Sequence, residues 1–138
     1  MFEFLYGGIK IKTDKESYKL GETINATIIL ELKKPVKARA LVVRFRAYRG
    51  RRKTGSYGPK LAGGLHLDER ILEKEGVFSG INEYNVSFNI PNDPRFASIP
   101  GLFGFIGSAS IHWEIVAKLD IPGGPDITAR KQLSVTGV

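Results

Sequence analysis

The stretch that decides the fold is residues 17–32, which reads S-Y-K-L-G-E-T-I-N-A-T-I-I-L-E-L. The Gly21-Glu22 pair predicts a turn, and the residues after it alternate between apolar and polar side chains. Ile24 and Ile28 fall on one face of this segment, and most of its polar residues fall on the other. A period of two, together with the β-branched residues, is typical of a half-buried β-strand.

The rest of the chain repeats this pattern in short runs that are separated by turn residues. Residues 67–75 fit either one helical turn or a short edge strand, and we prefer the strand. The sequence P-G-G-P-D at 122–126 is a tight reversal, so the strands on either side of it are expected to pair as an antiparallel hairpin. Since hardly any segment has a helical period, we predict an all-β fold: an antiparallel immunoglobulin-like β-sandwich with about seven to nine strands. Alternation predicts the other strands at residues 9–12, 38–48, 83–90, 110–121 and 127–135.

Length and composition limit the classes of protein that this chain can belong to. A chain of 138 residues predicts one domain, residues 1–138, with enough apolar content at 42% to form a core. There is no cysteine, which excludes disulfides, thiolate catalysis and thiolate metal sites. The first residues lack the basic segment of a signal peptide, and no apolar run approaches the roughly 18 residues of a membrane span. A soluble, cytoplasmic protein is the expectation.

The net charge of +7 is concentrated in the first sixty residues. A basic surface attracts anionic partners by long-range steering. The opposing interpretation is a solvated basic face that keeps sheet edges from pairing with other chains. The candidate anion-binding residues are Lys10, Lys12, Arg49, Arg51, Arg52 and Lys53.

A second candidate site is the loop at residues 96–107, which is rich in glycine and also apolar. Exposed apolar patches on soluble proteins often mark contacts with partners. The loop could equally fold over an open end of the sandwich or pack in a self-dimer. The candidate partner-binding residues are Phe96, Ile99, Leu102, Phe103, Phe105 and Ile106.

No catalytic motif is present. The two histidines, His66 and His112, lie on different predicted elements and lack the spacing of metal ligands. The acidic residues at positions 68–75 are clustered in a short segment that is interpreted as a solvated edge. We therefore predict that the protein is not an enzyme and needs no cofactor and no metal.

Four blocks follow one another along the chain: Tyr18-x-x-Gly21-Glu22-x-Ile24, A-R-A-L-V-V-R-F at 38–45, G-I-N-E-Y-N-V-S-F-N-I-P at 80–91 and S-I-H-W-E-I-V-A-K-L at 110–119. In this order, the four blocks resemble the arrestin-like superfamily. The resemblance implies a single sandwich of the arrestin N-terminal type, as in sporulation-control proteins, and a scaffold or adaptor role. The chain departs from the pattern at two positions. At Val86 an aromatic residue is commoner, and at Trp113 a tyrosine is usual. It has room for one sandwich, whereas arrestins carry two in tandem, and it has no match for the buried charged cluster that latches arrestins.

Together these features predict a protein-interaction module that binds partner proteins through exposed sheet edges, by strand addition, and through the apolar loop. A homodimer would cover edges that a lone sandwich leaves open. The alternative is a nucleic-acid or anionic-surface binder that uses the basic first strand and the loop at residues 49–60.

Overall fold

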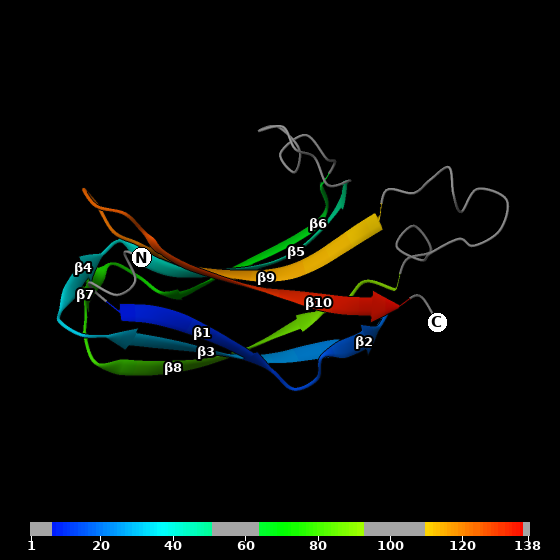
Figure 1. Ribbon diagram of the computed structural model, residues 1–138, viewed down its shortest axis with the longest axis horizontal. Helices are drawn as coiled ribbons and strands as arrows, with labels where there is room; N and C mark the ends of the chain where they lie inside the picture. The colour runs from blue at the N-terminus through cyan, green and yellow to red at the C-terminus, as the bar shows by residue number, and fades with distance from the viewer. Residues whose placement is uncertain (1–6, 51–63, 93–109, 137–138) are drawn as a thin grey trace, which may run out of the picture.

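A computed structural model describes residues 7–50, 64–92 and 110–136, and the regular structure in these ranges is β-strand throughout (Figure 1). The predicted all-β fold is confirmed. The structure has more strands than the seven to nine expected, because three-residue strands are too short for alternation to reveal. The strands are β1 (Gly7–Thr13), β2 (Ser17–Lys19), β3 (Thr23–Leu32), β4 (Val36–Ala38), β5 (Ala40–Gly50), β6 (Gly64–Glu73), β7 (Gly76–Phe78), β8 (Ile81–Asn89), β9 (Ser110–Asp120) and β10 (Ile127–Thr136).

Two sheets pack face to face as a sandwich (Figure 1). One sheet has the strand order β1-β3-β8, and the other has the order β2-β10-β9-β5-β6. The predicted β9–β10 hairpin is confirmed, with Ala117 opposite Ala129. The strand pairs are antiparallel except for β2 and β10, which run parallel. The short strands β4 and β7 form a separate pair at one end of the sandwich.

The core lies between the two sheets, where the alternating apolar residues meet. Ile24 and Ile28 of β3 are fully buried, as their period of two predicted. Phe45 of β5 is the central ring: its centroid lies 5.4 Å from that of Phe88 on β8 and 5.5 Å from that of Trp113 on β9. This cluster joins the two sheets through close aromatic contact.

Strand β6 bears on two expectations, of which the first is confirmed and the second is corrected. Residues 67–72 belong to a strand of ten residues, so the preferred edge strand is confirmed and the helical turn is wrong. The loop expected at residues 49–65 is shorter than predicted, because β5 continues to Gly50 and β6 begins at Gly64. Both extensions follow from the pairing of β5 with its neighbours, in which Gly50 lies opposite Ser110.

The turn between β2 and β3 is anchored to both sheets. The amide of Glu22 donates to the carbonyl of Lys19 at 3.0 Å, and Gly21 between them has a φ of +88°. The amide of Gly21 donates to the carbonyl of Ile90 at 3.1 Å, just beyond β8, and the amide of Leu20 donates to that of Thr136 on β10. Glycine is required at this turn because a side chain rarely adopts that φ.

We predict that Gly21→Ala lowers the free energy of unfolding by about 1–2 kcal/mol, the usual cost of a left-handed conformation for a residue with a Cβ. Gly124→Ala is the matched control, since Gly124 has no positive φ and a Cβ there would meet Ile121 Cγ2 at an ordinary 3.7 Å. Urea unfolding measures both variants. An equal loss in the two would show that the φ at position 21 is not the cause.

Candidate functional site

The two main sheets present four edges within the described residues: β1 and β8 on the three-stranded sheet, and β2 and β6 on the five-stranded sheet. An edge strand carries unpaired backbone N–H and C=O groups that can accept another strand. Natural proteins protect such edges by keeping them short or by placing charges on them. The four edges of this chain differ in this protection.

Three of the edges are protected. Strand β2 has only three residues, and β1 carries the exposed side chains of Lys10 and Lys12. Strand β6 carries charges on its inner face: Asp68 lies in register with the buried Phe45 of the neighbouring strand. Arg70, on the same face, forms an ion pair with Asp68 at 3.0 Å. Inward-pointing charges oppose the addition of a further strand, because the added strand would bury them.

Strand β8 lacks this protection. Its residues 84–89 read Y-N-V-S-F-N and contain no charged residue, proline or glycine. On the inner face, Tyr84 and Val86 stay half-buried, whereas the residues opposite them on β3, Ile28 and Ala26, are buried. Burial raises the pKa of Tyr84, and the nearby charge of Glu73 adds to this effect. Apolar surface therefore remains at this edge for a neighbouring strand to cover.

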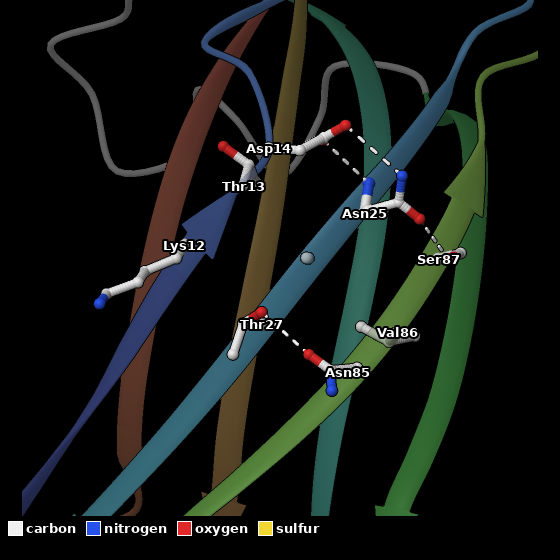
Figure 2. A pocket seen from close by; sticks show the side chains of 9 residues that line it. Lys12, Thr13, Asp14, Asn25, Thr27, Asn85, Val86 and Ser87 are labelled. Carbon is white, nitrogen blue, oxygen red and sulfur yellow. Dashed lines mark hydrogen bonds between the residues drawn. The ribbon is translucent and has the colours of Figure 1, made fainter.

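The outer face of β3 and β8 carries a row of uncharged polar side chains (Figure 2). Side chains that lie opposite each other on β3 and β8 are joined by hydrogen bonds. Thr27 Oγ1 donates to Asn85 Oδ1 at 3.0 Å, and Ser87 Oγ donates to Asn25 Oδ1 at 2.8 Å. Thr23 Oγ1 likewise donates to Asn89 Oδ1 at 2.9 Å. These bonds hold the amides and hydroxyls of β8 in fixed positions beside its free edge. The row borders a shallow, open depression of about 480 Å³ that Lys12 and Asp14 also line.

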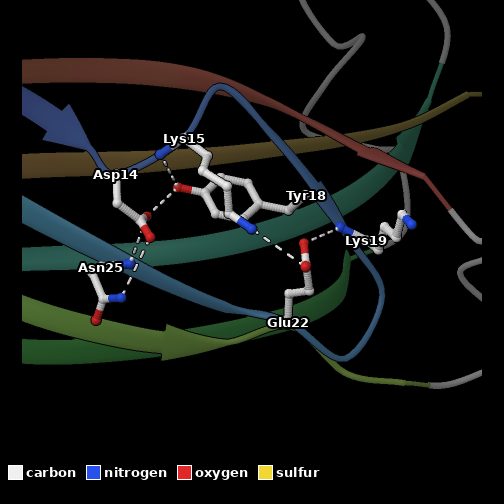
Figure 3. A network of polar contacts seen from close by, with 6 residues as sticks. All are labelled: Asp14, Lys15, Tyr18, Lys19, Glu22 and Asn25. Atoms are coloured by element: carbon white, nitrogen blue, oxygen red, sulfur yellow. Dashed lines mark hydrogen bonds and ion pairs between the residues drawn. The ribbon is translucent and has the colours of Figure 1, made fainter.

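A hydrogen-bond network fixes the end of this row (Figure 3). The hydroxyl of Tyr18, whose side chain is buried, donates to Asp14 Oδ1 at 2.6 Å and accepts from the amide of Lys15 at 3.0 Å. Asp14 Oδ1 also accepts from the amide of Asn25 at 3.1 Å. The hydrogen bond from Tyr18 lowers the pKa of Asp14, and the hydrogen bonds from Asn25 lower it further. Burial, followed by the bond to Asp14, raises the pKa of Tyr18.

Glu22 completes the turn beside this network. Its Oε1 accepts from the amide of Lys19 at 2.7 Å, and its Oε2 lies 3.3 Å from Lys15 Nζ (Figure 3). Both contacts lower the pKa of Glu22, and the hydrogen bond from the amide of Lys19 has the larger effect. The residues of the motif Tyr18-x-x-Gly21-Glu22 therefore have structural roles: they shape the turn and anchor it.

On the outer face of the five-stranded sheet, Glu114 of β9 is 1% exposed. It forms an ion pair with Arg46 of β5 and another with Arg130 of β10, the latter at 3.4 Å. Sequence reasoning missed this cluster, because alternation along β9 places Glu114 on the solvent side and does not reveal which side chains cover it. The ring of Tyr48 stacks on His112 nearby, with centroids 5.2 Å apart.

The structure describes three of the predicted anion-binding residues: the side chains of Lys10 and Lys12, both on β1, and the backbone of Arg49. Lys10 lies 3.9 Å from Glu31 as an ion pair, and Lys12 lines the depression. The backbone of Arg49 lies on β5, in the other sheet. The remaining candidates, Arg51, Arg52 and Lys53, lie outside the described residues.

The apolar loop remains a prediction. All of its candidate residues (Phe96, Ile99, Leu102, Phe103, Phe105 and Ile106) lie outside the described residues. Among residues 7–50, 64–92 and 110–136, no cluster of His, Cys, Asp or Glu could hold a metal ion. Within the same ranges, no helix has the length and apolar character needed to cross a membrane.

We predict that Tyr18→Phe lowers the free energy of unfolding at pH 7 by about 1 kcal/mol, because Asp14 loses a hydrogen-bond donor at an exposed position. Folding lowers the pKa of Asp14. Its stabilisation is therefore complete above the unfolded-state pKa of about 3.9 and is lost as the pH falls through the lower folded-state pKa. The difference between wild type and variant should shrink below about pH 4.

Urea unfolding at pH 7 and pH 3 measures this difference. Tyr48→Phe is the control, since Tyr48 contacts His112 and Arg46 through its ring, which the substitution keeps. A Tyr18→Phe effect that is the same at both pH values would contradict the assigned role of Asp14.

Comparison with known proteins supports the arrestin-like resemblance. No model of a protein family matches the chain. Arrestin domain-containing protein 4 of Mus musculus is 29% identical over a match that covers 88% of this chain. The crystal structure of Spo0M, the sporulation control protein of Bacillus subtilis, superimposes on 95% of this chain with a TM-score of 0.65 and 15% identity.

The chain spans 32% of the length of the arrestin domain-containing protein and 49% of the Spo0M chain. The match to Spo0M shows the fold, an arrestin-like β-sandwich, over nearly all of the chain. In sequence and in fold, the chain thus resembles the arrestin-like superfamily, as its four sequence blocks predicted.

Proposed function

We propose that this chain is a non-enzymatic, adaptor-type protein-interaction module that accepts an extended segment of a partner protein on the free edge of β8. The observation that carries the proposal is the contrast between the edges. Strand β8 is long and uncharged over residues 84–89, whereas β6 carries Asp68 and Arg70 on its inner face. Strand addition uses the backbone groups of such an edge for affinity and the alternate side chains for specificity.

The chemistry of β8 indicates which segments it can accept. Strand β3 pairs with the other side of β8 and shows which side chains fit beside it. Ala26 and Ile28 lie on the inner face of β3, and Thr27 lies on the outer face. A partner strand on the free side meets the same alternation. Its inward residues would cover Tyr84 and Val86, so apolar side chains fit there. Its outward residues would lie beside amides and hydroxyls, so uncharged hydrogen-bonding side chains fit there.

The similar proteins support a binding role. One is named for its arrestin domain and the other for control of sporulation, and neither name describes a reaction. Because the chain spans only part of each, the partners of those proteins are not transferred to this chain.

Binding of nucleic acid or an anionic surface has less support. Basic side chains on both sheets pair with carboxylates: Lys10 lies 3.9 Å from Glu31 on the three-stranded sheet, and Arg44 lies 2.5 Å from Glu69 on the five-stranded sheet. Such pairing reduces the positive field that would attract a polyanion. A steep fall in affinity with salt would favour this alternative, whereas strand addition depends little on salt.

Amide hydrogen exchange tests the proposal directly. Nine-residue peptides selected from a random display library on the immobilised protein serve as probes. We expect bound peptides to protect alternate amides of β8, because only every second N–H points to the free edge. The amides of β6 serve as the internal control and should exchange as before. The measurement is made at protein concentrations at which the chain is monomeric, and peptides that bind there with unchanged exchange along β8 would refute the site.

A matched pair of variants tests the same edge. Asn85→Lys and Thr27→Lys add the same charge to the same face, and both remove the hydrogen bond between these two residues. Only Asn85 lies on the edge strand, whereas Thr27 lies on the central strand. We expect Asn85→Lys to weaken binding of uncharged or basic peptides by about 2–5-fold, and Thr27→Lys to change it little. Equal effects, measured by fluorescence polarisation, would contradict binding at the edge.

The loop at residues 96–107 is the second part of the proposed interaction surface. If it contacts a partner, Phe103→Ser with Phe105→Ser should leave the unfolding midpoint in urea unchanged and reduce binding of a partner that contacts the loop. Loss of the folded state in this variant, seen by circular dichroism, would instead assign the loop to the core.

A further inference from the structure

We propose that the free edge of β8 pairs with β8 of a second copy of this chain, antiparallel about a twofold axis at Val86, and joins the two three-stranded sheets into one. Residues 84–89 of β8 are complementary to themselves in this arrangement. Directly opposite residues of an antiparallel pair lie on the same face of the sheet. The inner residues Tyr84, Val86 and Phe88 therefore meet inner residues, and the outer residues meet outer ones.

The register follows from the side chains. With Val86 opposite Val86 of the second copy, Tyr84 faces Phe88 and Asn85 faces Ser87. Apolar residues meet at three successive inner positions, and amides meet hydroxyls at the outer positions between them. The β3–β8 pair already uses this chemistry, since Ser87 Oγ donates to the amide oxygen of Asn25. The free edge would repeat the pairing that its other side makes.

Charge selects both this strand and this register. Over residues 84–89 no charged side chain meets another across the axis, and Glu83 faces Asn89. Pairing of β6 with itself is disfavoured. The register that matches Asp68 with Arg70 would place Glu69 opposite Glu69 and would bury the charges of the inner face. Self-association at β8 needs no such burial.

The pairing has a regulatory consequence, which rests on the proposed function. A second copy and a partner segment would occupy the same edge, so they compete for it. A partner strand then binds to the monomer, and self-association lowers its apparent affinity. The edge is thereby covered when no partner is present.

Light scattering behind size exclusion, over a range of protein concentrations and without any peptide, tests the pairing. The wild type should reach the mass of two chains as the concentration rises. Asn85→Lys with Ser87→Lys places lysine opposite lysine twice across the axis, so the concentration for half dimerisation should rise at least about tenfold. Thr23→Lys with Thr27→Lys is the matched control. It adds the same charge to the same face and also removes two cross-strand hydrogen bonds, yet it lies on the central strand.

Cysteine cross-linking tests the register. The chain has no cysteine, so a single introduced thiol can form a disulfide only with its counterpart in a second copy. Val86→Cys should cross-link rapidly on mild oxidation, because Cα atoms directly opposite each other lie within disulfide range. Ile71→Cys on β6, at a position 60% exposed, is the control for random collisions and should cross-link more slowly.

The outcomes separate this inference from the proposed function. A wild type that stays monomeric at all concentrations, or a Val86→Cys variant that cross-links no faster than the control, overturns the self-pairing. Peptide binding by that monomer would leave the proposed function intact. A dimer that is lost only in the edge variant supports the self-pairing, even if no peptide protects β8.

Discussion

The position of β3 is the constraint on which the sandwich depends. It pairs with β1 over residues 26–32 and with β8 over residues 23–31, and its inner face is buried from Ile24 to Leu30. A strand between two others offers no free edge to another chain, so its apolar residues can form the core without a risk of association through this strand. The Tyr18–Glu22 turn leads the chain into it, and the network around Asp14 holds its start against β8 through Asn25.

In a sheet of three strands, each of the two outer strands has unpaired backbone N–H and C=O groups along its free side. The chain covers the open backbone unequally: β1 carries lysines, β6 carries an inward ion pair, and β8 has no charged side chain over residues 84–89. Charges that protect an edge also prevent its use, because an added strand would have to bury them. An edge without them is either used by a partner or prone to self-association. Both proposals for this chain follow from that single asymmetry.

The outer faces of the two sheets are built differently. The three-stranded sheet carries a row of hydroxyls and amides that bond to one another, whereas the five-stranded sheet buries Glu114 beneath two arginines. A carboxylate buried in this way needs both partners, since removal of either leaves it poorly compensated. This cluster ties β5, β9 and β10 together on the face away from the core. It therefore supports the sheet and occupies basic groups that would otherwise attract anions.

The sequence by itself determined where the long strands β3, β5, β8, β9 and β10 lie and which of their faces point inward, because period-two alternation depends on the chain alone. It also determined the turn at Gly21, since the need for a positive φ is local. Only the tertiary structure decided which strand lies at an edge, and this property makes β8 a candidate site. The inward position of Asp68 and Arg70 was likewise hidden in the sequence, where the charges at positions 68–75 indicated a solvated edge. At the edge of a sandwich these side chains face inward and still reach solvent, with Arg70 lying 5.1 Å from the ring centroid of Phe88. Burial depends on neighbours that are distant in the chain, and alternation within one strand carries no information about them.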